Sequence, residues 1–169
     1  MRIRPDTPAD VGAVTDLLHA AFAGPDEARI VTALRGRVTP LVSLVAEDDG
    51  RVVGHILFSP VTLDGSPHLP MMGLAPMAVA PARQRQGIGS ALVRAGLEAC
   101  RSTGSAAVVV VGHPAYYPRF GFVPASRVGL TCEYDVPDEV FMALELQPGA
   151  LAGHAGRARF HDAFGAATV

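Results

Sequence analysis

The stretch that decides the fold of this chain is Arg83-Gln84-Arg85-Gln86-Gly87-Ile88-Gly89-Ser90. An apolar run over residues 72–79 precedes it and an amphipathic pattern over residues 87–101 follows, which predicts a turn between a strand and a helix. Glycine lets the backbone approach a bulky anion because it has no Cβ. The first turn of a helix offers free N–H groups and a partial positive charge. Together these features predict a phosphate-binding turn, to which Arg83 and Arg85 add cationic side chains.

The residues around the two glycines narrow the kind of phosphate group that this turn could hold. A Walker loop requires Gly-Lys-Ser or Gly-Lys-Thr, and the chain contains no lysine. A dinucleotide-binding fingerprint requires a third glycine, where this sequence has Leu92. Taken alone, the turn leaves two interpretations open: an anion site, or a tight turn before an amphipathic helix.

The composition is that of one globular domain, expected over residues 1–169. Hydrophobic residues make up 49% of the chain, which is enough for a full core. The net charge is -2 and no long run of one sign occurs, which argues against a nucleic-acid or membrane-surface partner. No signal peptide and no apolar run of about 20 residues is found, so we expect a cytoplasmic protein whose Cys100 and Cys132 are reduced. No CxxC or HExxH motif is present, so no metal site is expected.

Turn and capping signals divide the rest of the chain into short elements. Thr7 and Pro8 are typical of a helix start, and Asp48-Asp49-Gly50 is typical of a hairpin turn. Residues 106–111 form the most apolar stretch, which predicts a central strand buried on both faces. The order predicts an α/β protein with a mixed sheet and helices on both faces. Strands are expected over residues 2–4, 41–47, 51–59 with an extension over 61–63, 72–79, 106–111 and 141–146. Helices are expected over residues 7–22, 26–35 and 87–101, and a short helix or a turn over residues 114–119.

Several segments, in the right order along nearly the whole chain, resemble the YhbS-like branch of the GNAT superfamily of N-acetyltransferases. The turn Gln84–Gly89 is similar to its acyl-CoA motif, Gln/Arg-x-x-Gly-x-Gly/Ala. Four other segments are similar to its third strand, fourth strand, fifth strand with the following helix, and C-terminal part: Gly54–Val61, Gly73–Val79, Val109–Phe122 and Phe141–Leu146.

This resemblance implies the GNAT fold, in which a mixed central sheet of about six to seven strands splays between strands four and five. Pantetheine then lies in the gap and pairs with the backbone of Met77 and Val79, where an N–H group also stabilises the oxyanion. Pro76 agrees with this picture, since a bulge frees backbone groups for a ligand. The implied residues that bind the co-substrate, acetyl-CoA, are Met77, Ala78, Val79, Gln84, Arg85, Gln86, Gly87, Ile88, Gly89 and Ser90.

The implied activity is transfer of the acetyl group of acetyl-CoA to a primary amine by direct attack, without a covalent acetyl-enzyme. Tyr117 lies four residues before Gly121, where the family places a tyrosine that protonates the leaving thiolate. Tyr116 is the alternative acid, and a packed aromatic beside Phe120 is the structural alternative for Tyr117. The implied partner is a small-molecule or peptide amine, and a homodimer is compatible with this activity.

The general base and the acceptor site are less well defined by the sequence. Residues 71–79 contain no carboxylate, so the base is left unassigned. His113 could accept a proton near neutral pH, although a loop cap is the simpler interpretation, and His55 is expected to be a structural histidine. The acceptor loops are expected in residues 24–37 and 63–70. The carboxylates considered for the acceptor site are Glu47, Glu133 and Asp135.

Two other functions are left open by the sequence. A sensor module could bind CoA or acyl-CoA without turnover, and a nucleotide-binding enzyme could use the same turn. Thiol release from acetyl-CoA discriminates the first from a transferase, and the preference for CoA over ATP or NAD discriminates the second.

Overall fold

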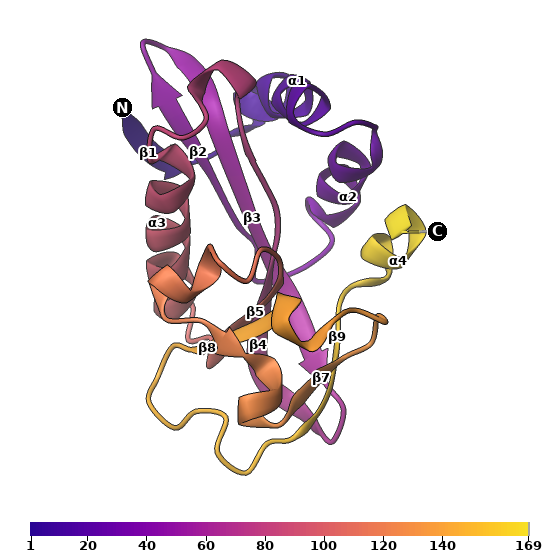
Figure 1. Cartoon of the computed structure of the whole chain (residues 1–169). Helices are drawn as coiled ribbons and strands as arrows, with labels where there is room; N and C mark the ends of the chain where they lie inside the picture. Colours follow the sequence, from indigo (N-terminus) through magenta and orange to yellow (C-terminus); the bar gives the residue numbers. More distant parts are fainter. Residues whose placement is uncertain (169) are drawn as a thin grey trace.

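The computed structural model describes the backbone of residues 1–168 and the side chains of residues 1–165. Its sheet runs in the order β1-β2-β3-β4-β5-β8-β6, with β7 and β9 joined to it through β3 (Figure 1). Along that path β4 and β5 pair in parallel and their neighbours pair antiparallel, so the sheet is mixed as predicted. The strands are β1 (Arg2–Pro5), β2 (Val42–Asp48), β3 (Arg51–Leu63), β4 (Ser66–Val79), β5 (Ala107–Val111), β6 (Val123–Pro124), β7 (Leu130–Cys132), β8 (Phe141–Glu145) and β9 (Gly156–Arg159).

Helices cover both faces of the sheet, which confirms the prediction from sequence. On one face α3 packs through Leu92 onto Phe58 and its neighbours, and Gly96 allows this close approach because a Cβ there would overlap the Phe58 ring. On the other face α1 and α2 bury Leu18 and Leu34 against the sheet (Figure 1). The helices are α1 (Val11–Ala21), α2 (Asp26–Leu34), α3 (Ile88–Ser102) and α4 (Asp162–Thr168), with 3-10 turns at Pro8–Asp10, Pro81–Arg83, Tyr117–Phe120, Ala125–Val128 and Asp138–Val140.

Strand β4 is longer than the sequence predicts. β3 continues through Pro60 to Leu63, in agreement with the expected extension over residues 61–63, but β4 already begins at Ser66, although the sequence predicts a strand only from residue 72. The polar residues at this end become strand because Leu63 pairs with both Ser66 and the tail strand β9. The Arg159 guanidinium also holds Asp64 at the turn through two hydrogen bonds of 2.8 Å.

The feature that shapes the site is the divergence of β4 from β5. The two strands pair only from Met71 to Gly73 of β4. Beyond this point the register between β3 and β4 shifts by one residue, because Ala75 and Pro76 together lie opposite the single residue Leu57. The shift confirms the bulge expected at Pro76. From Leu74 to Val79, β4 has no strand partner on its β5 side within the described residues.

Candidate functional site

The open edge of β4 presents backbone groups to the gap. The N–H of Ala80 donates to the carbonyl of Val53 on β3 at 2.8 Å. Because successive N–H groups of a strand point to opposite edges, those of Val79 and Met77 point away from β3 and into the gap. Gln84 lies on the same side, since its amide donates to the Val79 carbonyl at 3.1 Å.

The turn before α3 presents a second set of N–H groups. Arg85 and Gly87 both have positive φ, 63° and 85°, and Gly87 is the residue that precedes the first turn of α3. The N–H groups of Ile88, Gly89 and Ser90 have no acceptor among the described residues, as expected for the start of a helix. The local sequence therefore builds a positive, donor-rich helix start at the gap.

These two sets of donors line one cleft, which we name the β4–α3 cleft, with a volume of about 520 Å³. Its lining includes every residue that the sequence predicts for the co-substrate except Ala78 and Gln86. The full lining is Met77, Val79, Arg83, Gln84, Arg85, Gly87, Ile88, Gly89, Ser90, Tyr116 and Arg119.

The side chains of Ala78 and Gln86 lie elsewhere, for local reasons. Ala78 is buried on the α1–α2 face, because neighbouring residues of a strand alternate between faces. Gln86 is held beside the 3-10 turn, where it accepts from Arg83 Nε at 3.2 Å and donates to the Ala82 carbonyl at 3.4 Å.

Three guanidinium groups surround the β4–α3 cleft, and the sequence motif predicts only two of them. Arg83 is partly neutralised by Asp48, 2.8 Å away. Arg85 follows directly in the turn. Arg119 comes from the segment after β5, where its guanidinium stacks over the Tyr116 ring at 4.5 Å from the centroid. Such a ring of arginines suits a ligand that carries several phosphate groups.

The two adjacent tyrosines face different cavities. The Tyr116 hydroxyl lies in the β4–α3 cleft and is hydrogen-bonded to the Ser90 hydroxyl at 3.1 Å. Tyr117 is buried, its ring packs on Gly112 and Phe122, and it lines another cavity. Burial, together with the nearby Tyr116, raises the pKa of Tyr117 to about 12, so its phenol keeps its proton at neutral pH.

This second cavity, which we name the α2–β5 pocket, has a volume of about 280 Å³. Met77 lines both cavities, so the pocket and the β4–α3 cleft are neighbours that share this residue as a wall. The lining is Phe22, Glu27, Ile30, Leu74, Ala75, Pro76, Met77, Val111, Tyr117 and Phe164.

Sequence reasoning missed Glu27 as a residue of this site. The helix over residues 26–35 was expected, and residues 24–37 were expected near the acceptor, but no pattern singles out Glu27 within them. Residues 63–70 were expected to form an acceptor loop, and most of them are strand instead. These residues belong to the β3–β4 hairpin and pair partly with β9, and none of them lines either cavity.

The other candidates from the sequence lie outside both cavities. Glu47 accepts a hydrogen bond from Arg4, and Glu133 accepts one from the backbone N–H of Phe160. Asp135 is exposed. The carbonyl of His113 accepts the N–H groups of Tyr116 and Tyr117, which agrees with a loop-capping position.

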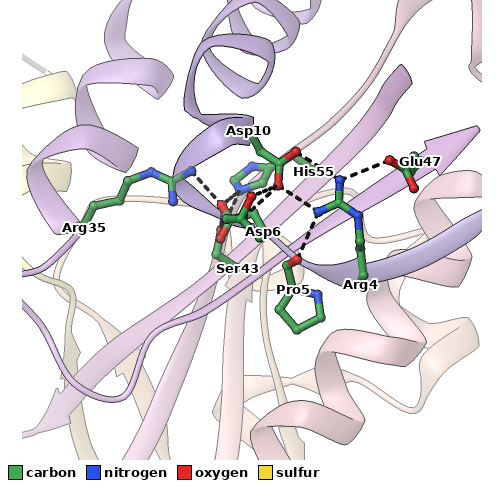
Figure 2. Close-up of polar contacts among 9 residues, drawn as sticks. Arg4, Pro5, Asp6, Asp10, Arg35, Ser43, Glu47 and His55 are labelled. Carbon is green, nitrogen blue, oxygen red and sulfur yellow. Dashed lines mark hydrogen bonds and ion pairs between the residues drawn. The ribbon is translucent and has the colours of Figure 1, made fainter. Parts of the chain in front are cut away.

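His55 belongs to a buried polar network beneath α1, together with Ser43 and Asp6 (Figure 2). The Ser43 hydroxyl donates to Asp6 Oδ2 at 2.7 Å, so its oxygen is left to accept from Nε2 of His55 at 2.9 Å. The carboxylate also pairs with Arg35 at 2.7 Å. His55 is therefore the neutral tautomer with its proton on Nε2. This buried, hydrogen-bonded position agrees with the structural role that the sequence predicts for His55.

The burial of His55 leads to a prediction about acid stability. Burial, and to a lesser degree Arg35, lowers its pKa from 6.5 to about 4, against the opposing pull of Asp6. The unfolded chain binds this proton below pH 6.5 and the folded chain does not, so stability falls as the pH drops from about 6.5 to about 4. We expect the free energy of unfolding, measured in urea, to fall by about 2 kcal/mol more between pH 7 and pH 5 than in the non-titrating variant His55→Gln. Equal losses in both proteins would contradict this assignment.

Neither a metal centre nor a membrane span is found in the described part of the chain. No group of three or more histidine, cysteine, aspartate or glutamate side chains there could hold a metal ion. No described helix has the length and apolar character that crossing a bilayer requires.

Comparison with known proteins agrees with this geometry. A model of the acetyltransferase (GNAT) domain family matches residues 2–125. The N-acetyltransferase YhbS of Escherichia coli is 38% identical over 165 residues, covering 97% of this chain and 98% of YhbS. Its crystal structure in complex with CoA superposes with a TM-score of 0.91, covering 97% of this chain and 91% of that chain. A GNAT family acetyltransferase of Brucella melitensis in complex with acetyl-CoA is 36% identical, with a TM-score of 0.79 and coverage of 96% and 97%.

Proposed function

This chain belongs to the GNAT family of acetyltransferases, and we propose that its β4–α3 cleft is the acetyl-CoA site of an N-acetyltransferase. One observation carries the assignment of the site. The free N–H groups of the α3 start and those of the open β4 edge line the same cleft. A ligand with a diphosphate at one end and an amide-containing arm at the other satisfies both sets.

In this proposal the diphosphate of acetyl-CoA binds the N–H groups from Gly87 to Ser90, with Arg85 and Arg119 beside it. The pantetheine arm then extends along β4 and pairs with Met77 and Val79. A side chain at position 89 would enter this path, because a Cβ on Gly89 would lie 3.3 Å from the Tyr116 hydroxyl and 3.7 Å from Met77 Cε. The absence of a side chain on Gly89 is thus a property that this ligand needs.

The chemistry follows from this placement. Acetyl-CoA supplies an acyl carbon that a neutral primary amine can attack. The N–H of Met77 stabilises the oxygen of that carbonyl as negative charge develops on it. As the C–S bond breaks, the Tyr117 phenol gives its proton to the departing sulfur, and the proton lost by the amine nitrogen returns to Tyr117 through solvent. The products are an N-acetylated amine and CoA as a free thiol.

We propose that residues 1–169 form one GNAT domain, since β9 from the tail pairs with β3 of the central sheet. A cytoplasmic location is in keeping with the two free thiols, Cys100 and Cys132, which are expected in a reducing compartment. The acceptor in this proposal is a small-molecule or peptide amine.

A thiol-release assay tests this function. The protein is mixed with acetyl-CoA and a panel of primary amines, and free CoA thiol is followed with a chromogenic disulfide. We expect amine-dependent thiol release, and calorimetry should show CoA and acetyl-CoA binding more tightly than ATP or NAD. Binding of CoA without turnover on any amine would indicate a sensor, and preferential binding of ATP or NAD would refute the assignment of the cleft.

A further inference from the structure

The α2–β5 pocket has a lining that is apolar except for two groups at different points of its wall. Ile30 of α2 and Phe164 of α4 contribute buried side chains, and Leu74 of the β4 bulge contributes another. The polar groups are the carboxylate of Glu27 and the phenol of Tyr117. A mostly apolar cavity with a small number of polar groups is typical of a site that orients a small ligand.

We propose that the α2–β5 pocket binds the acetyl acceptor, and that this acceptor is a small primary amine with a single ammonium group and an apolar body. Glu27 pairs with the ammonium and takes one of its protons, which it later releases to solvent, so that the nitrogen gains the lone pair with which it attacks the thioester carbon. The apolar body lies against Ile30 and Phe164. This inference rests on the proposed function, because it takes the neighbouring β4–α3 cleft as the acetyl-CoA site.

The state of the Glu27 carboxylate supports an ammonium ligand. Its Oε2 atom is buried and has no hydrogen-bond donor among the described residues. An unpaired buried acceptor is unfavourable, and more so when it is charged, so a bound donor is strongly favoured. Glu27 also lies in the first turn of α2, where the helix dipole stabilises its negative charge. An N–H donor on a cationic ligand supplies the hydrogen bond that Oε2 of Glu27 lacks.

The position of the pocket places the amine beside the reacting group. Met77, whose backbone faces the proposed pantetheine path, forms a wall common to the pocket and the β4–α3 cleft. Tyr117, the proposed acid, lines the pocket directly. An amine held in the pocket therefore lies on the side of the bulge from which the thioester carbon can be attacked.

The charges of the lining argue against polycationic acceptors. Glu27 is the only carboxylate among the described residues that line the pocket. A second ammonium on the ligand would enter an apolar wall without a partner, and burial of an unpaired charge is strongly unfavourable. The pocket thus selects an amine such as an alkylamine or arylalkylamine over a diamine of the same length.

A matched pair of acceptors tests this selection directly. With the unmodified protein and saturating acetyl-CoA, we expect kcat/KM for n-hexylamine to exceed that for hexamethylenediamine at least tenfold. The two ligands share the same chain and differ in the second ammonium. Equal or better use of the diamine, or no acetylation of any apolar monoamine, would overturn the proposal.

Two variants test the residues. Glu27→Gln should lower kcat/KM for n-hexylamine at least tenfold, while Asp26→Asn, on the same turn but 48% exposed and outside the pocket, should leave it unchanged. Val111 is 41% exposed at the pocket, so Val111→Phe should narrow it without disturbing the core and reduce kcat/KM for n-hexylamine at least tenfold relative to n-propylamine. If neither variant alters acceptor kinetics, the pocket is not the acceptor site.

Acetyl-CoA affinity separates this inference from the proposed function. Calorimetry should give the same acetyl-CoA affinity for Glu27→Gln and Val111→Phe as for the unmodified protein. Normal acetyl-CoA binding with unchanged acceptor kinetics would refute the acceptor pocket and leave the proposed function standing. Failure of the unmodified protein to bind acetyl-CoA would refute the proposed function itself.

Discussion

Tyr117→Phe is expected to lower kcat by about 10²-fold or more, because it removes the phenol that protonates the departing sulfur. The ring stays in place, since its contacts with Gly112 and Phe122 do not involve the hydroxyl. Folding and acetyl-CoA affinity should therefore be preserved. Steady-state thiol release measures kcat, and calorimetry measures acetyl-CoA affinity on the same preparation.

The adjacent tyrosine is the matched control. The Tyr116 hydroxyl lies 3.1 Å from the Ser90 hydroxyl at the α3 start, on the side of the diphosphate. Tyr116→Phe is therefore expected to weaken acetyl-CoA binding modestly and to leave kcat nearly unchanged. A large loss of kcat in Tyr116→Phe with normal turnover in Tyr117→Phe would transfer the acid role to Tyr116.

Gly89→Asp is expected to weaken CoA binding by about 10²-fold or more, through repulsion of the diphosphate and intrusion into its path. The variant should fold well. A glycine in a helix is less stable there than most residues, and an acidic residue in the first turn interacts favourably with the helix dipole. Thermal unfolding should thus give an unchanged or higher Tm, while calorimetry shows the loss of affinity.

Gly89→Asn separates charge from bulk, because asparagine has nearly the shape of aspartate without its charge. We expect its CoA affinity to lie between those of the unmodified protein and Gly89→Asp, at least tenfold tighter than the latter. Equal affinities in the two variants would show that bulk alone is responsible. Unchanged affinity in Gly89→Asp would exclude the α3 start as the diphosphate site.

The two cavities explain why the sequence carries a recognisable motif for the co-substrate but none for the acceptor. The β4–α3 cleft depends on backbone groups, which vary little with side chains. The α2–β5 pocket depends on side chains from α2, β5 and α4, which meet only in the folded molecule. A family resemblance therefore predicts the co-substrate far better than the acceptor.

The sequence alone determined the elements whose signals are local. The turn at residues 83–90, the amphipathic helix after it and the apolar strand at 106–111 all lie close to their predicted bounds. Pro76 indicated an irregular point in this strand, an edge or a bulge, and β4 has a bulge there. Each of these depends on spacing, backbone restriction or helix-end chemistry within a few residues, and such signals are present in the linear chain.

Only the tertiary structure decided which side chains meet. Glu27 becomes a pocket residue because α2 lies against the diverging ends of β4 and β5, and the two tyrosines separate because adjacent residues point to different cavities. The neutral state of His55 likewise comes from burial between distant segments. Burial and convergence depend on contacts between residues far apart in sequence, and no local pattern encodes them.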